Sequence, residues 1–489
     1  MTDLAQIQVR AAINSRSSLG LATENRILPA PRDRGPLPLS LFQQRLWFLE
    51  QLVPNNPAYI VPEETRFKGV LNREALRRAL DEIIRRHESL RTRFAGVANN
   101  LVQLIDPPYP ADLSVQDLSS LPPEQREEEA RCIVFAESRK PFDLQRGPIL
   151  RTRLLVLGQE ENILLITMHH IVADVWSLKV LLNEMQRLYS AFSQGKPSPL
   201  PELPIQYADF AVWQNLQFQN GGFEEHLAYW RTKLKGISEL NLLTDKPRPA
   251  MQGFSGASYR FQWPLALSSA LRILSQQEGV TLYMLLLAAF QAFLQRYTQS
   301  EDIAVVTPST NRDRPEIEGL IGFFVNTLVL RSSCSPSQGF RAFLADVRDT
   351  ALNGYAHQEV PFEKLVEELH PSRDLSRNPL AQIAFGFDSA SIPADFGGLH
   401  ATVQSIDNST AKFDLFLSLR LKAEGIGGRI EYNTDLFEAG TMVRMAGHLE
   451  RLVEGIVADP DCPIGMLPLL REEERRQIVE EWNRTERAV

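Results

Sequence analysis

The sequence predicts an α/β protein of two lobes, because strand-like and helix-like segments alternate through both halves of the chain. In the first half, apolar runs at 154–156 and 163–166 are joined by the turn-forming residues 158–162, a pattern typical of a β-hairpin. Apolar residues then recur at helical spacing from Leu178 to Phe192. In the second half, helical patterns lie near 206–235 and 265–297, and they are followed by strand-like runs at 303–306, 325–330 and 383–387.

Clusters of prolines suggest where the chain divides. Residues 1–36 end among four prolines, which is typical of a leader or linker, and residues 196–204 hold four prolines in nine residues. We therefore expect an N-terminal lobe over 37–205 and a C-terminal lobe over 206–470. The charged tail, 471–489, is expected to be a helical linker that leads into a further domain.

Composition narrows the class of protein. The net charge of -8 over 489 residues gives no reason to expect nucleic acid or an anionic membrane as a partner. The three cysteines lie far apart, so neither a disulfide framework nor a zinc module is predicted, and a reduced, cytoplasmic setting fits. The longest apolar stretch, 282–294, is too short to cross a bilayer and is predicted to be a buried helix capped by Thr281. Another helix is expected to begin at Asn72.

The most informative segment is His169-His170-Ile171-Val172-Ala173-Asp174, where a predicted strand turns into a predicted helix. Neighbouring strand residues point to opposite faces, so only one imidazole can readily face a given cavity. Asp174 falls near the N-cap of the helix. The residues alone leave three interpretations open: a catalytic histidine, a structural histidine pair with a capping aspartate, or a metal site. A metal site would need further ligands, and no HExxH or paired CxxC motif is present.

The histidine segment and several others, in order along the chain, resemble the motifs of nonribosomal peptide synthetase condensation domains. The likeness covers nearly the whole chain from about Leu37, and residues 467–470 and 481–485 resemble the linker to an adenylation domain. The other matching segments are Ser40–Trp47, Arg86–Thr92, Tyr207–Trp213, Ile321–Thr327, His357–Phe362 and Arg373–Leu380.

The resemblance implies a V-shaped pair of lobes similar to chloramphenicol acetyltransferase, with the active site in a tunnel between them. A donor thioester and an acceptor aminoacyl thioester would enter on phosphopantetheine arms from opposite faces, and the acceptor amine would attack the donor carbonyl to form an amide. His170 is then the catalytic histidine, His169 supports it, and Asp174 is structural and pairs with Arg91. No metal or bound cofactor is implied, because phosphopantetheine arrives on carrier proteins or coenzyme A.

Several matched residues have alternative roles. His170 could act as a general base or by positioning the amine. Asn326 could hydrogen-bond in the tunnel or shape a turn, and Arg91 and Arg377 could form ion pairs or contact substrate. The remaining matched residues are expected to be structural: Trp47, Trp213, Phe324 and His357. Direct acyl transfer is the simpler hypothesis, since 253–256 falls short of the GxSxG nucleophile motif.

The sequence departs from the family pattern at Val175, where the family has glycine. Valine is bulkier and disfavours positive φ, so full activity is in doubt. Natural variation, a natural narrowing of the tunnel and an engineered substitution are the three explanations.

The donor is expected to be a fatty acyl-coenzyme A, because no carrier-protein motif precedes Leu37 and Met1 could be the natural start. The domain would then be a starter that N-acylates the first amino acid on an aminoacyl carrier protein, beside an adenylation domain. One alternative is an elongation domain whose donor arrives on a separate upstream carrier protein. Another is a non-catalytic recruitment domain, which is disfavoured because both histidines and Asp174 are present.

Overall fold

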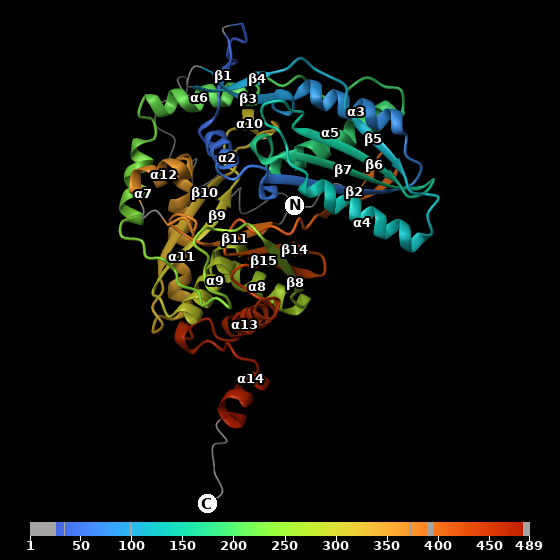
Figure 1. The fold of residues 1–489 in the computed structure, drawn as a ribbon. Coiled ribbons are helices and arrows are strands. Elements are labelled where there is room, and N and C mark those ends of the chain that lie inside the picture. Colours follow the sequence, from blue (N-terminus) through green and yellow to red (C-terminus); the bar gives the residue numbers. More distant parts are fainter. Residues whose placement is uncertain (1–25, 34, 98–99, 371–373, 389–394, 483–489) are drawn as a thin grey trace, which may run out of the picture.

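Two six-stranded sheets form the centres of two lobes in the computed structural model (Figure 1). The structure describes residues 26–482 except 34, 98–99, 371–373 and 389–394. In the first lobe the strands lie in the order β12 (Asp395–Phe396), β13 (Leu399–Ser405), β2 (Ile60–Lys68), β7 (Glu161–His169), β6 (Leu150–Val156) and β5 (Leu113–Asp117). A three-stranded sheet in the same lobe is made of β1 (Leu37–Pro38), β4 (Asn100–Ile105) and β3 (Thr92–Val97).

The sheet of the second lobe is mixed. Its order is β10 (Asn326–Ser333), β9 (Asp302–Ser309), β11 (Ile383–Asp388), β14 (Leu415–Lys422), β15 (Gly425–Asn433) and β8 (Gly256–Gln262). The α-helices of the described chain are α2 (Leu41–Leu52), α3 (Arg73–Arg86), α4 (Pro123–Arg139), α5 (Val175–Ser193), α6 (Tyr207–Gln219), α7 (Glu224–Leu234), α8 (Leu265–Gln277), α9 (Leu282–Thr298), α10 (Pro315–Glu318), α11 (Phe340–Ala356), α12 (Phe362–Leu369), α13 (Ala439–Ala458) and α14 (Glu472–Arg476). The α/β fold class predicted from the sequence is confirmed.

The hairpin that leads to the two histidines is buried on both faces. β6 and β7 pair antiparallel, as residues 158–162 predict. Residues 162–169 of β7 are all buried, because helices α3 and α5 cover one face of the sheet and α4 covers the other. A strand that is apolar on both faces is fixed in its layer, so β7 is a rigid support for the two histidines at its end.

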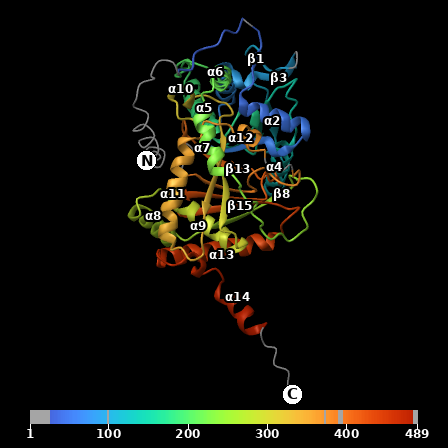
Figure 2. The same cartoon turned by 90° about the vertical axis from the view of Figure 1, so that its left-hand side faces the viewer.

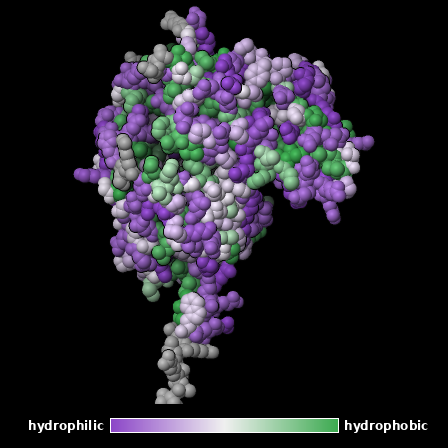
Figure 3. Space-filling model, viewed as in Figure 1, coloured by the Kyte–Doolittle hydropathy of each residue, from purple (hydrophilic) through white to green (hydrophobic). Residues whose placement is uncertain are grey.

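The second lobe is built around α9. Thr281 caps this helix by accepting a hydrogen bond from the Met284 amide at 3.2 Å, and residues 284–295 are buried, as predicted. Among the described residues, no single helix is long and apolar enough to cross a membrane; α8 and α9 pass that test only as a pair bent by 106°. Hydrophilic residues cover much of the face seen in Figure 3, with apolar ones scattered between them.

The two lobes exchange elements. β12 and β13 follow β11 of the second sheet in sequence, yet they form one edge of the first sheet, where β13 pairs antiparallel with β2. In the other direction, α6 packs on the first lobe, where Asp209 accepts a hydrogen bond from the Ala30 amide at 2.8 Å. The expected division at 205/206 therefore does not separate the two sheets along the chain. Figure 2 shows α14 leaving the second lobe on the side away from the first.

Candidate active site

The two histidines lie at the end of β7, where the chain makes one 3₁₀ turn, His170–Val172, before α5 begins at Val175. Helix α2 holds this turn in place: the Gln43 side chain donates to the Ile171 carbonyl oxygen at 3.1 Å. Gln43 is itself fixed in a capping box with Ser40. The first matched motif, 40–47, therefore supports the histidine turn, a role that sequence reasoning did not assign to Gln43.

The hydrogen bonds of His170 fix which ring nitrogen carries the proton. Its Nδ1 lies 2.7 Å from the Ala173 carbonyl oxygen. A carbonyl can only accept, so Nδ1 is the donor and the neutral ring keeps its lone pair on Nε2. Phe323 of the second lobe packs edge-on against the ring, with 5.0 Å between ring centroids. His170 stays partly exposed. Nε2 is therefore a hydrogen-bond acceptor at the junction of the lobes.

Electrostatics keep this imidazole neutral. Burial, with a further contribution from the charge of Lys412, lowers the pKa of His170 to about 3. His169 has the opposite tautomer, because its Nδ1 accepts from the Ile171 amide at 3.1 Å and its Nε2 faces Glu50 at 3.9 Å. Burial and the neighbouring His170 lower the pKa of His169 to about 3 as well. His169 is 2% exposed and Phe142 packs against it, so it supports the turn from inside the lobe.

Asp174 caps α5 and joins the two lobes. It accepts hydrogen bonds from the Ser177 amide at 2.7 Å and from the Phe324 amide of the second lobe at 3.1 Å. Its charge is paired with Arg312, 3.2 Å away and equally buried. The expected pairing of Asp174 with Arg91 is wrong. Arg312 lies 138 residues further along the chain and reaches Asp174 because residues 309–324 of the second lobe fold over the start of α5.

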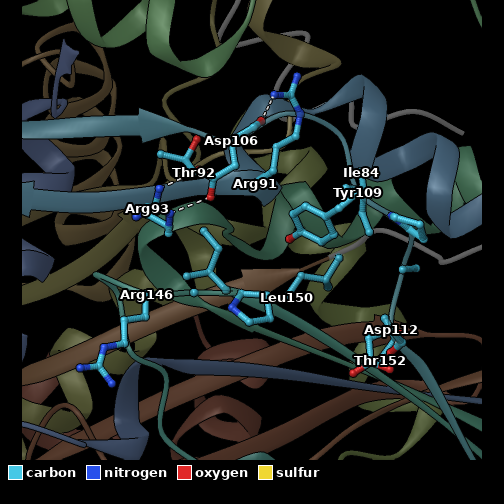
Figure 4. A pocket seen from close by; sticks show the side chains of 15 residues that line it. Ile84, Arg91, Thr92, Arg93, Asp106, Tyr109, Asp112, Arg146, Leu150 and Thr152 are labelled. Carbon is cyan, nitrogen blue, oxygen red and sulfur yellow. Dashed lines mark hydrogen bonds and ion pairs between the residues drawn. The ribbon is translucent and has the colours of Figure 1, made fainter. Parts of the chain in front are cut away.

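Arg91 instead lines a cavity of about 300 Å³ in the first lobe (Figure 4). It donates to the Asp106 carbonyl oxygen and lies 4.0 Å from Glu88. Arg93, which pairs with the Asp106 carboxylate at 2.7 Å, and Tyr109 line the same cavity. Of the residues that line it, none belongs to the segment 169–175. Arg91 is thus separate from the histidine turn.

Asn326 is a structural residue of the second lobe. Its amide donates to the carbonyl oxygens of Gln358 and Val360, both at 2.6 Å, and its side-chain oxygen accepts from the amides of Thr327 and Phe362. The matched segments 321–327 and 357–362 are therefore tied together through one buried side chain. Both N–H groups and the oxygen of this amide are already occupied within the second lobe.

Val175 occupies the first helical position of α5, and its side chain is 61% exposed. The backbone φ of Val175 is not positive. The backbone therefore does not require glycine there.

The other matched residues have partners within the domain. Trp47 and Phe324 are buried and Trp213 is partly buried in one core cluster, while Arg377 forms ion pairs with Glu239 and Asp374. His357 lies 2.9 Å from His226, nitrogen to nitrogen. Arg373 lies outside the described residues.

A close approach of the backbone completes the junction of the lobes. Tyr207 donates to the Phe323 carbonyl oxygen at 2.6 Å and contacts the Ser40 hydroxyl at 2.8 Å. A Cβ atom on Gly322 would lie 2.0 Å from the Tyr207 ring, so only glycine fits. The Gly322 amide donates to the Ser177 hydroxyl at 3.0 Å. These contacts seat Phe323 against His170.

Comparison with known proteins identifies the family. Residues 33–479 match the family described as Condensation domain. The chain belongs to the condensation domain family. One subunit of the linear gramicidin synthase of Brevibacillus parabrevis is 45% identical over 94% of this chain, which spans 6% of that protein. Phosphinothricin tripeptide synthetase PhsC of Streptomyces viridochromogenes is 39% identical, over 92% of this chain and 42% of that protein.

Solved structures agree on the fold. The X-domain from teicoplanin biosynthesis matches with a TM-score of 0.83 and 26% identity, covering 91% of this chain and all of that one. A starter condensation domain of rhizomide synthetase, solved with C8-CoA, matches with a TM-score of 0.77 over 90% of this chain and 98% of that one. Its 21% identity supports the fold alone. This is a nonribosomal peptide synthetase condensation domain.

Proposed function

We propose that the domain joins an acyl donor thioester to the amine of an aminoacyl thioester on a carrier protein, with His170 as the catalytic residue. The observation that carries the proposal is the free lone pair of His170 Nε2, held at the junction of the lobes by the Nδ1 hydrogen bond to Ala173. Asp174 and Arg312 act as structural residues that hold the two sides of this junction together.

The low pKa of His170 favours positioning over strong base catalysis. An imidazole whose pKa is about 3 is too weak a base to deprotonate an ammonium group of pKa about 8. The acceptor amine therefore enters in its neutral form, and Nε2 accepts a hydrogen bond from it and directs its lone pair at the donor carbonyl carbon. The C–N bond forms, the C–S bond breaks, and the proton lost by nitrogen ends on the departing thiolate.

For the donor, we propose an acyl or aminoacyl group on a carrier protein, which is the elongation alternative. The support comes from the relatives: two proteins of the linear gramicidin synthase are 45% and 44% identical to this chain, which covers only 6% and 9% of their length. In such long proteins most of the chain lies outside the matching domain, so an upstream carrier domain can supply the donor. The fatty acyl-coenzyme A donor expected from the sequence is the second candidate, and the geometry at His170 suits either.

A recruitment role is the alternative of a different class. The teicoplanin X-domain, solved also in a complex with OxyB, has the same fold. Against that role for this chain stand the intact histidines and the capped Asp174, which a pure docking surface does not require.

The test is mass spectrometry of an aminoacyl-loaded carrier protein after incubation with the domain. One sample receives acyl and aminoacyl carrier donors, and a parallel sample receives fatty acyl-coenzyme A donors of increasing chain length. A mass increase only with carrier donors supports the elongation reaction, and one with coenzyme A donors establishes the starter reaction. No mass increase with either donor, beside an active relative as positive control, would contradict amide formation by this domain.

A further inference from the structure

A lysine from the second lobe lies close to the histidine turn. Lys412 sits between β13 and β14, and its ammonium is 5.4 Å from the centre of the Tyr59 ring. Tyr59 immediately precedes β2, whose first residue, Ile60, is paired with His169. The register places Tyr59 beside the histidine turn, so the Lys412 ammonium reaches the same junction as His170.

The backbone of Lys412 is firmly held. Its carbonyl oxygen accepts hydrogen bonds from the side-chain amides of Gln252, at 3.1 Å, and Asn378, at 2.8 Å. The preceding residue, Ala411, donates its amide to the Phe254 carbonyl oxygen at 3.0 Å. The four-carbon side chain therefore starts from a fixed point and extends toward the first lobe.

The Lys412 ammonium forms no ion pair with a carboxylate of the described residues. Among the residues that the structure describes, no carboxylate lies within 4.0 Å of its ammonium, whereas the two nearby carboxylates are already paired with arginines. Two arginine–carboxylate pairs face it, Arg45 with Glu363 and Arg429 with Glu431. The other titratable groups around it are Tyr59, His169 and His170. Burial lowers the pKa of Lys412 to about 8, although the side chain keeps part of its surface exposed.

The Lys412 ammonium is thus largely shielded from water where the two lobes meet. An unpaired cation in such a place costs stability, and a cation–π contact at 5.4 Å offsets only part of that cost. A buried cation without a carboxylate partner can stabilise negative charge that develops beside it during a reaction.

We propose that Lys412 is a second catalytic residue, whose ammonium stabilises the oxyanion that forms on the donor carbonyl when the acceptor amine attacks. The inference rests on the proposed amide-forming reaction. As the C–N bond forms, the carbonyl π electrons move onto oxygen beside the ammonium, and they return when the thiolate leaves. The same charge lowers the pKa of His170, which keeps Nε2 available as an acceptor.

Two substitutions and one control test the role. Lys412→Met removes the charge with little change in length, and Lys412→Arg keeps a charge that persists above pH 12. Lys422→Met is the control, because Lys422 is in the same lobe and 47% exposed. The measurement is the single-turnover rate constant of amide formation between pH 6 and 10 with preloaded carriers, corrected for thioester hydrolysis, together with the melting temperature of each variant.

In the native domain we expect the rate to fall above pH 8 as Lys412 loses its proton. Lys412→Met should be about 10²-fold slower at pH 8, lack this fall, and melt at the same temperature or higher. Lys412→Arg should keep more activity and move the fall to higher pH, and Lys422→Met should match the native domain.

The proposal is overturned if Lys412→Met stays within threefold of the native rate. If Lys412→Met fails to fold, Lys412→Arg decides alone: a fall at the same pH as in the native domain contradicts the role. His170→Ala, measured in parallel, separates the two proposals. Amide formation that survives His170→Ala removes the catalytic role of His170 but not the amide-forming reaction, which fails only if the native domain forms no amide. Loss of activity in His170→Ala with a fully active Lys412→Met removes only the role of Lys412.

Discussion

Replacing Asp174 with asparagine keeps the size of the side chain and its capping oxygen but removes the charge that faces Arg312. Both residues are 2% exposed, so water cannot replace the missing charge. Breaking a buried ion pair by removing one partner costs about 3–5 kcal/mol. We expect Asp174→Asn to fall within this range: the remaining side-chain oxygen can keep the hydrogen bond from the Ser177 amide, but the NH2 group that replaces the second oxygen cannot accept the one from the Phe324 amide.

Arg312→Met should cost more. Besides its pair with Asp174, Arg312 donates to the carbonyl oxygens of Ile317 at 2.8 Å and Leu320 at 2.7 Å. The Ile317 carbonyl oxygen keeps a second donor, the Leu320 amide at 3.2 Å, whereas loss of the donor to the Leu320 carbonyl oxygen adds about 1 kcal/mol or more. The double variant should lose less stability than the sum of the losses in Asp174→Asn and Arg312→Met, with a coupling energy of about 2 kcal/mol. The reason is that the second substitution removes the buried charge that the first one left without a partner.

The assay is urea unfolding at pH 7, followed by far-UV circular dichroism and tryptophan fluorescence in parallel, in a double-mutant cycle. The matched control is Asp174→Asn combined with Arg91→Met, which should be additive within about 0.5 kcal/mol because Arg91 faces the cavity beside Asp106. A coupling below about 0.5 kcal/mol between residues 174 and 312, or a large one between 174 and 91, would refute the reasoning.

Three further predictions concern the same junction. Because the pKa of His170 is about 3, its imidazole is neutral from pH 5 upward. Only the acceptor amine then titrates, so the logarithm of the single-turnover rate constant should rise with a slope of one between pH 5 and 7. A slope of two below pH 6.5 would show a second titrating group. Val175→Gly should change the transfer rate by less than about threefold and lower the free energy of unfolding by at most about 1 kcal/mol, since the side chain is exposed at the first helical position; a large gain in rate would show that valine obstructs the site. Gly322→Ala should destabilise the domain by about 1–3 kcal/mol in urea unfolding, because its Cβ would overlap the Tyr207 ring; an unchanged midpoint would contradict that packing.

Local patterns in the sequence predicted local structure well. The hairpin before the histidines and the caps at Asn72, Asp174 and Thr281 all depend on residues within a few positions of one another, and the structure confirms each of them. Hydrophobic spacing and turn residues act over such distances, so one sequence is enough to detect them.

Long-range partners could not be predicted in the same way. Asp174 has several candidate arginines in the sequence, and spacing gives no means of choosing Arg312 over Arg91. The return of β13 to the first sheet is equally hidden, because a strand pattern does not specify which edge the strand will join. Lys412 carries no spacing signal either, and its position beside Tyr59 depends only on the way the lobes meet. The sequence offered only an indirect indication of the role of Arg312, which precedes the matched segment 321–327.

The most direct test of the central claim is the single-turnover rate constant of amide formation by His170→Ala with both carriers preloaded. The account predicts a fall of about 10²–10⁴-fold in a domain that remains folded, with a somewhat lower urea midpoint because the hydrogen bond to Ala173 and the packing against Phe323 are lost. A His170→Ala domain that is folded and forms the amide at the native rate would contradict the account.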